Sequence, residues 1–160
     1  MSIAPFLTAD PIIQVHLMAA LAAVFLGPIN AFKLVRGVWH QRIGLIWMTT
    51  MFVLAVSGLF ISSWSLIGPF NPIHMFSVLV LWSIGKGLWH LRQREFVRHG
   101  AEMRGLYFQG LGAAGLFTFL PGRTLNDIFF PNAPVTGFIL TFIVVATLAI
   151  TGWQRSAKRA

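Results

Sequence analysis

Five histidines are the side chains of this chain best suited to chemistry: His16, His40, His74, His90 and His99. Imidazole binds metal ions and exchanges protons near neutral pH. The chain has no cysteine, so it has no disulfide, no thiolate nucleophile and no cysteine-ligated zinc or iron–sulfur site. A cofactor site in this protein is therefore expected to use histidine.

His16 and His74 match the arrangement of the two axial ligands of a b-type haem. Each lies about six or seven residues outward of the centre of an apolar segment, so a helical rise of ~1.5 Å per residue places both rings at a similar depth. Six-coordinate haem iron takes one imidazole nitrogen from each side. We therefore predict these histidines as candidate haem ligands, with haem b as the candidate cofactor. The alternative is that each ring hydrogen-bonds a neighbouring helix or interfacial water.

His90 is not expected to add a second haem. Sixteen residues separate His74 from His90, and ~100° per residue turns them by ~160°, onto different faces of one helix. His90 also has no histidine at its own depth on the first apolar segment, because His40 lies well beyond the end of that segment.

A second group of polar residues combines two imidazoles with two guanidiniums: His40, Arg42, His99 and Arg104. Each pair comes just before an apolar segment, so both pairs are expected at the cytoplasmic surface. Such a group can bind an anionic lipid headgroup, a phosphate or the carbonyl of a quinone. The alternative is an interfacial cluster that sets membrane topology and caps two helices.

The composition indicates that a membrane protein carries these residues. Of the 160 residues, 56% are hydrophobic and only 10% are charged, and the mean hydropathy is +0.75. A soluble domain needs roughly a quarter of its residues charged, so the outer surface is expected to face lipid. The net charge of +8 does not indicate nucleic acid, because the basic residues lie in short stretches between apolar runs.

Five segments are long and apolar enough, or nearly so, to cross ~30 Å of hydrocarbon as a helix of ~20 residues. The fourth is the weakest, because it is short and rich in glycine. The predicted fold is all-α: a polytopic bundle of five transmembrane helices in a single domain, residues 1–160. The predicted spans cover residues 11–32, 43–64, 72–89, 105–120 and 134–153.

The distribution of basic residues predicts the orientation of this bundle. With the N-terminus outside, eleven of the twelve lysines and arginines lie on the cytoplasmic side and only Arg123 lies outside. This asymmetry follows the positive-inside rule. It predicts an N-out, C-in, multi-pass protein of the bacterial inner membrane.

Gly27 and Pro28 interrupt the first span, with Asn30 one turn further inward. Proline removes a backbone hydrogen bond and kinks a helix. We therefore expect a polar notch here that lines a cavity. The alternative is a structural kink of the kind that membrane helices tolerate.

A weak internal repeat relates the first two spans to the next two. A shift of 58 residues takes His16 to His74, and a shift of 59 takes His40 to His99. Two such hairpins in the same orientation would pack about a pseudo-twofold axis along the membrane normal, with the fifth helix added. The alternative is chance similarity between apolar helices.

Several chemistries are disfavoured. All four acidic residues lie in predicted loops or at interfaces, so no predicted span offers the carboxylate proton relay that pumps and secondary transporters generally need. The sequence also has no phosphate-binding glycine loop, no serine nucleophile elbow and no HExxH helix. An enzyme is therefore not the favoured interpretation.

The order of these features resembles an uncharacterised family of bacterial integral membrane proteins, the domain-of-unknown-function family twenty-three-oh-six. The resemblance covers roughly residues 12 to 125, and Glu102 and Asn30 depart from it, because tryptophan and glutamine are expected there. It implies a membrane topology and three recurrent histidines (16, 40 and 99) but no activity, and it does not single out His74. The matching residues are His16, Gly27, Pro28, the run His40 to Gly44, His99, Met103 and Arg104.

Three functions remain open from the sequence. The first is a non-catalytic accessory or structural subunit of a respiratory or photosynthetic inner-membrane complex. The second is a small b-type haem or quinone-interacting electron-transfer protein, and the third is a small transporter or sensor of a lipophilic compound. The expected partners are the lipid bilayer and either other membrane proteins or further copies of this chain, with no nucleic acid.

Overall fold

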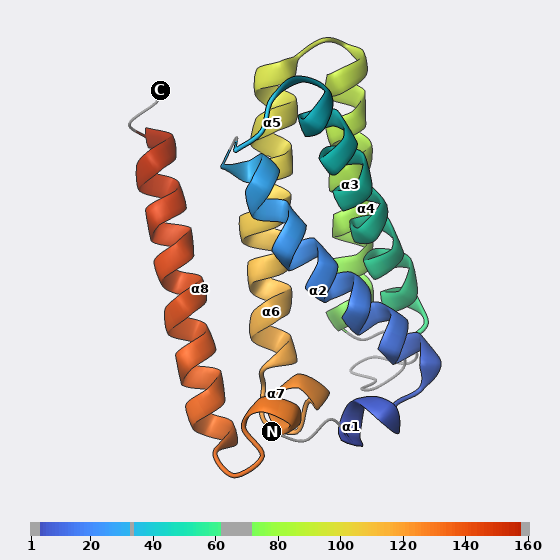
Figure 1. Cartoon of the computed structure of the whole chain (residues 1–160), viewed down its shortest axis with the longest axis vertical. Coiled ribbons are helices and arrows are strands. Elements are labelled where there is room, and N and C mark those ends of the chain that lie inside the picture. The colour runs from blue at the N-terminus through green and yellow to red at the C-terminus, as the bar shows by residue number, and fades with distance from the viewer. Residues whose placement is uncertain (1–3, 33, 62–71, 158–160) are drawn as a thin grey trace. The chain divides into compact units, whose positions relative to one another are not determined.

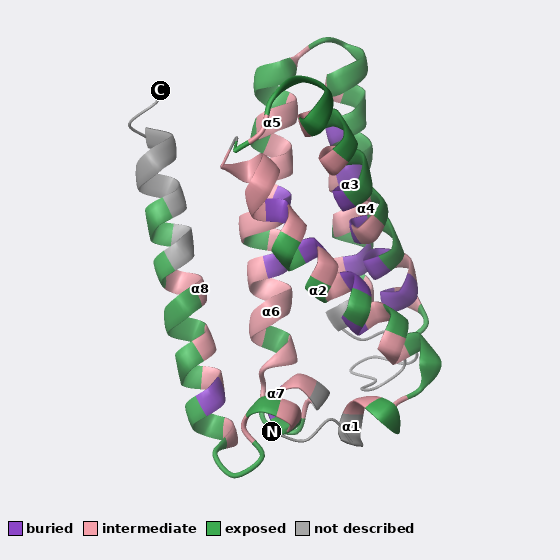
Figure 2. Cartoon of the chain, viewed as in Figure 1, coloured by how far each residue is buried: buried purple, intermediate pink, exposed green. Residues whose placement is uncertain are grey.

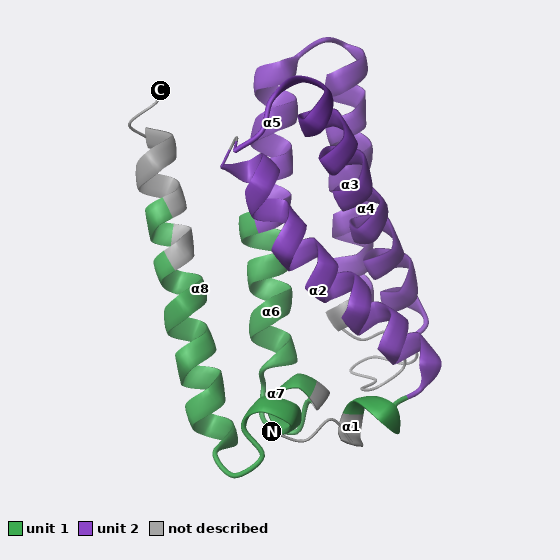
Figure 3. Ribbon diagram, in the orientation of Figure 1, with its two compact units in different colours: residues 1–9, 108–160 green, residues 10–107 purple. Residues whose placement is uncertain are grey.

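The computed structural model describes residues 4–32, 34–61 and 72–157, and every regular element in these ranges is a helix (Figure 1). The all-α fold class is therefore confirmed for this part of the chain. The chain divides into two compact units, residues 10–107 and residues 1–9 with 108–160 (Figure 3).

The described residues of the unit 10–107 form four α-helices and the first two residues of a π-helix. α2 (Pro11–Ala31) and α4 (Pro72–Arg92) both pack against α3 (Gly37–Leu59), and α5 (Phe96–Gly105) packs mainly against α4. The π-helix η1 (Leu106–Leu111) follows α5 directly, and the boundary between the two units falls within it.

The start of α2 is encoded locally. The Asp10 carboxylate accepts a hydrogen bond of 2.8 Å from the Ile12 backbone N–H, and Pro11 occupies the first turn, where its missing N–H has no cost. Pro28 lies inside the helix, which continues to Ala31. The predicted first segment, 11–32, therefore matches α2 to within one residue.

The second helix begins earlier than the apolar pattern predicts. α3 starts at Gly37 rather than residue 43, because a helix continues through polar residues when its backbone hydrogen bonds continue, whatever the hydropathy. It ends at Leu59, and the predicted residues 62–64 lie outside the described residues. α4 likewise continues to Arg92, beyond the predicted end at residue 89.

α4 ends in a Schellman motif without glycine. The Glu95 N–H bonds the His90 carbonyl at 2.9 Å, and the Arg94 N–H bonds the Leu91 carbonyl at 3.1 Å. Arg94 occupies the left-handed region, with φ 61°. The Glu95 carbonyl then accepts the His99 N–H at 2.9 Å, so α5 begins at once and the two helices form a tight hairpin.

The unit of residues 10–107 combines small and polar residues with larger apolar ones, such as Trp47, Met51 and Leu54, at its buried positions (Figure 2), and it exposes many other large apolar residues. Its buried residues lie where α3 meets its neighbours and include Ala19, Ala23, Gly27, Ala55, Ser57, Gly58 and Ser77. Phe25, Leu45 and Trp82 are among its most exposed apolar residues. This distribution is typical of helices packed in lipid, where small residues let helix backbones approach.

Two of the described helices, α2 and α3, are long and apolar enough to cross a membrane. Their most apolar windows are only 17% and 33% buried, whereas the core helix of a soluble protein is mostly buried. α8 contains a shorter apolar stretch, Pro134–Thr147. A bundle of five spans and the parallel repeat remain predictions.

The unit of residues 1–9 and 108–160 contains α1 (Ala4–Leu7), the rest of η1, α6 (Gly112–Thr118), α7 (Thr124–Phe129) and α8 (Pro134–Ala157). Asn126 on α7 is fully buried, and its Nδ2 donates to the carbonyls of Phe119 at 2.6 Å and Pro134 at 2.8 Å. One amide group thus joins the end of α6 to the start of α8. Gly112 on α6 faces Val145 on α8, and a β-carbon at Gly112 would lie 3.3 Å from the valine.

Candidate functional site

His16 on α2 is held by Ser57 on α3, at a distance of 3.1 Å between Nδ1 and Oγ. The single hydroxyl proton of Ser57 is directed at the carbonyls of its own helix, 2.7 Å to Val53 and 3.0 Å to Leu54. The hydroxyl oxygen therefore accepts the proton on Nδ1 of His16. Nε2 of His16 consequently carries the lone pair, which is the form of the ring that can ligate a metal.

His74 on α4 contacts the same helix two residues further along. Its Nε2 lies 2.9 Å from the Leu59 carbonyl, and because a carbonyl can only accept, Nε2 carries the proton. Leu59 is the last residue of α3, so its carbonyl has no N–H partner within the helix. His74 thus caps α3, and ligation of a metal through Nε2 would require this bond to break.

Gly58 allows α2 and α4 to approach α3 at this level. A β-carbon at Gly58 would collide with the Ser77 hydroxyl and lie 3.3 Å from Cε1 of His16. The structure therefore brings the two predicted haem-ligand histidines to the same turn of α3, that of Ser57, Gly58 and Leu59. Among the residues that the structure describes, no group of three or more His, Asp and Glu side chains could hold a metal ion. The haem role of these two histidines remains a prediction, since a bis-histidine haem needs only two protein ligands.

The notch at Gly27 and Pro28 is filled by two aromatic side chains. Pro28 has no N–H, so the Val24 carbonyl lacks its usual helix partner, and the Tyr107 hydroxyl donates to it at 3.3 Å. One residue earlier, Nε1 of Trp47 donates to the Ala23 carbonyl at 3.0 Å. Gly27 makes room for both rings, because its β-carbon would collide with Tyr107 and lie 3.0 Å from Nε1 of Trp47.

Sequence reasoning located the notch but missed both donors. The signal for Tyr107 is that it is the one tyrosine of the chain and lies in a predicted span whose only other polar side chains are those of Gln109 and Thr118. Asn30, which the notch was expected to contain, instead donates from Nδ2 to the His40 carbonyl at 3.1 Å. Its Oδ1 is buried and has no hydrogen-bond partner among the described residues.

The four residues predicted to bind a headgroup or quinone make separate local contacts. The Arg42 guanidinium lies 5.7 Å from the centroid of the Trp39 ring, and His40 contributes the backbone carbonyl just described. On α5, Nδ1 of His99 donates to the Gly87 carbonyl of α4 at 2.8 Å. A β-carbon at Gly100 would lie 3.3 Å from Nη1 of Arg104, so this arginine folds back on its own helix. Ligand binding by these four residues remains a prediction.

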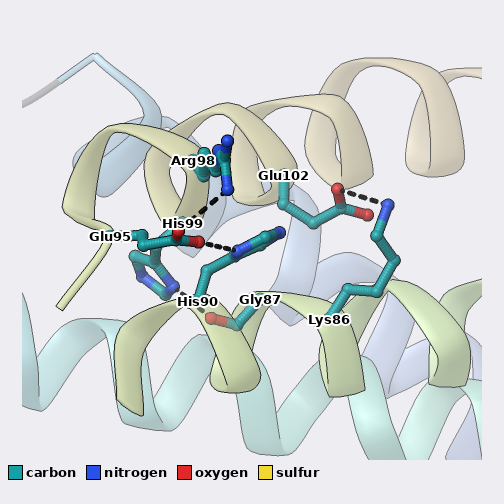
Figure 4. Close-up of polar contacts among 7 residues, drawn as sticks. All are labelled: Lys86, Gly87, His90, Glu95, Arg98, His99 and Glu102. Atoms are coloured by element: carbon teal, nitrogen blue, oxygen red, sulfur yellow. Dashed lines mark hydrogen bonds and ion pairs between the residues drawn. The ribbon is translucent and has the colours of Figure 1, made fainter. Parts of the chain in front are cut away.

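A polar network that the sequence did not predict joins α4 to α5 (Figure 4). Glu95 accepts from Nδ1 of His90 at 2.7 Å and from Nη1 of Arg98 at 2.8 Å, one bond to each carboxylate oxygen. These contacts lower the pKa of Glu95, with the hydrogen bond from His90 as the largest cause and Arg98 as the next favourable one. Nζ of Lys86 lies 3.2 Å from the Glu102 carboxylate. The spacing of Glu95 and Arg98 by three residues was the available signal for part of this network.

A family model described as a predicted membrane protein (DUF2306) matches residues 13–152. The match extends beyond the roughly 12–125 over which the motifs resemble that family, and it takes in most of α8. No curated protein and no solved structure matches the chain. Since the matched region covers most of the 160 residues, from α2 into α8, the protein belongs to this family of predicted membrane proteins.

Proposed function

We propose that the protein is a non-catalytic, multi-pass structural or accessory subunit of a bacterial inner-membrane complex. The proposal includes the five spans and the N-out, C-in orientation expected from the basic residues. It is supported by the contacts of the polar side chains, which bind neighbouring segments of the chain to one another.

The observation that carries the proposal is that four of the five histidine rings join neighbouring segments of the chain. His16 joins α2 to α3, His74 joins α4 to α3, and His99 joins α5 to α4. His90 bonds Glu95, the N-cap residue of α5. A catalytic centre directs its polar groups at a substrate, whereas these groups stabilise helix contacts.

The outward surface of the same helices is suited to lipid or to helices of a partner. Trp39, Trp82 and Trp89 are all well exposed, at 63%, 68% and 61%. Tryptophan is common both at membrane interfaces and at the centre of protein interfaces. We therefore infer that this surface contacts the bilayer and either another membrane protein or a second copy of the chain.

Purification from native membranes tests the proposal. The tagged protein, extracted in mild detergent and cross-linked before extraction in a parallel sample, should elute with a defined set of membrane proteins in constant stoichiometry. The control is the same protein expressed in a foreign membrane, which should elute alone or as a homo-oligomer. Elution from native membranes as a monomer without partners, in both samples, would contradict the proposal.

A b-type haem or quinone-interacting protein is the second candidate, and the ring of His16 favours it. Donation from Nδ1 to Ser57 fixes the orientation of the ring and leaves the lone pair on Nε2, as in metal-ligating histidines. Oxidised and dithionite-reduced absorption spectra of the purified protein would show a sharp α-band if haem b is bound. His16→Ala and His74→Ala should each abolish the Soret band. Full haem content in both variants would exclude these two histidines as the ligands, and a wild-type protein that contains no haem would exclude a haem function. The third candidate, a small transporter or sensor of a lipophilic compound, is supported only by the notch at Gly27 and Pro28. In the structure the side chains of Tyr107 and Trp47 occupy that notch.

A further inference from the structure

The turn between α4 and α5 exposes an unusual combination of side chains. Five of its exposed residues, Arg92, Arg94, Phe96, Val97 and Arg98, are named the arginine turn below. Phe96 is 64% exposed and Val97 is 85% exposed, although both are large apolar residues. Arg92, Arg94 and Arg98 are exposed beside them. We propose that the arginine turn is a binding site for the headgroups of anionic phospholipids.

The charge of the turn favours an anion despite the carboxylate in its middle. Residues 92–98 contain three arginines and one glutamate. Glu95 already accepts one bond on each oxygen, from His90 and from Arg98, so its charge is offset within the protein. Arg92 and Arg94 remain to contact phosphate oxygens, and Arg98, whose side chain is 70% exposed, still presents donors to solvent.

The backbone of the turn holds Arg94 in place. Arg94 occupies a left-handed conformation, φ 61°, at a position where glycine is favoured, and the two Schellman hydrogen bonds fix it there. A strained non-glycine residue in a well-bonded turn is an observation that points to a use for its side chain. The exposed side chain at this position is a guanidinium, the group whose donors match phosphate oxygens in pairs.

The apolar residues select a lipid rather than a soluble anion. If α4 spans the bilayer as proposed, Arg92 lies about 12 residues from the centre of the span, or ~18 Å at ~1.5 Å per residue. This exceeds the ~15 Å half-thickness of the hydrocarbon and places the turn among the headgroups. At that depth Phe96 and Val97 can enter the boundary between headgroups and acyl chains while the arginines contact phosphate. A soluble phosphate compound would leave both apolar side chains in water.

Lipid retention by the purified full-length protein tests this site. Native mass spectrometry should detect phosphatidylglycerol that stays bound through delipidation, with phosphatidylcholine retained far less. The triple variant R92Q/R94Q/R98Q should lower the apparent affinity for phosphatidylglycerol by at least about tenfold, because each arginine near a headgroup contributes about fivefold. Excess inorganic phosphate should not displace the lipid.

Single substitutions provide the matched control. Arg36, like Arg94, is an exposed arginine in a connection between two helices and precedes a residue with positive φ, Gly37. R94Q should weaken lipid retention several-fold and R36Q less than about twofold. Arg94→Gly, which suits the left-handed turn, should weaken retention as R94Q does, so a loss cannot be attributed to misfolding.

Equal retention of phosphatidylglycerol by the wild type and the triple variant would overturn the site. Equal losses in R36Q and R94Q would also overturn it, since binding would then follow overall charge. The measurement uses the isolated protein, so its outcome is independent of whether the chain co-purifies with a membrane complex.

Discussion

The hydroxyl of Tyr107 donates a hydrogen bond to the carbonyl of Val24, the one carbonyl in α2 whose N–H partner Pro28 removes. The two residues are 83 positions apart in the chain. A proline inside a helix leaves a backbone acceptor, and in a membrane such an acceptor must find another donor. Tyr107 therefore compensates for Pro28 across the interface between α2 and η1.

Tyr107→Phe removes this donor and keeps the ring. The loss should lower the free energy of unfolding by about 0.5–1.5 kcal/mol, the net contribution of one hydrogen bond, at the lower end because the 3.3 Å bond is long and partly exposed. Denaturant titration in detergent measures it. In the Pro28→Ala background, where the alanine would supply a backbone N–H to the Val24 carbonyl, the same substitution should have a much smaller effect. Equal effects in both backgrounds would show that the two residues are not coupled.

Gly27→Ala places a methyl group against the Tyr107 ring, where the β-carbon has no space. Overpacking of this kind should destabilise the protein by about 1–3 kcal/mol. Gly85→Ala is the matched control, because nothing lies within 4 Å of its β-carbon position on α4. Since alanine favours a helix over glycine by about 1 kcal/mol, Gly85→Ala should be neutral or stabilising. Destabilisation by both substitutions to the same extent would count against close packing at Gly27.

Ser57→Ala removes the hydroxyl oxygen that Nδ1 of His16 contacts. The expected loss is about 0.6–1.7 kcal/mol, the range found for hydrogen bonds between membrane helices. His16→Ala and the double variant complete a cycle in which the double loss should be smaller than the sum of the single losses. Additive losses, measured in the same detergent titration, would mean that the 3.1 Å contact contributes nothing to stability.

Glu95 makes the α4–α5 hairpin sensitive to acid. Its pKa is lowered from the ordinary 4.5, so its contribution to stability is complete above that value and is lost as the pH falls through the lowered pKa. The free energy of unfolding should therefore fall more steeply below about pH 4.5 in the wild type than in Glu95→Gln. Glu95→Gln should also be less stable near neutral pH. Parallel pH profiles for the two proteins would exclude a role for this carboxylate.

Arg94→Gly relieves the left-handed conformation at the end of α4. A non-glycine residue there is less stable than glycine by about 1 kcal/mol, so the variant should unfold at a higher denaturant concentration. Arg92→Gly, two residues earlier and at the last residue of α4, should instead lose up to about 1 kcal/mol. The opposite signs distinguish the backbone effect from removal of one positive charge, which both variants share.

Sequence reasoning was most accurate where structure depends on neighbouring residues. The first and fifth predicted spans begin at prolines 11 and 134, and α2 and α8 begin at the same two residues. It was less accurate for α3, which begins at Gly37, because hydropathy reports the depth of a residue and not the end of a backbone hydrogen-bond ladder. The hairpin turn at Arg94 contains no glycine, so the sequence did not indicate the left-handed conformation of this residue.

The sequence by itself determined that this is a helical membrane protein of a recognisable family. The reason is that the hydropathy of a segment and the interruption of a helix by proline both depend only on residues close together in the chain. It also determined that Val24 would lack a partner. Only the tertiary structure decided that Tyr107 supplies it, that Ser57 holds the proton-bearing nitrogen of His16, and that His90 and Arg98 share the carboxylate of Glu95. Each of these choices depends on which donor the packed helices bring within about 3 Å of an acceptor, and that distance is not encoded in any local segment.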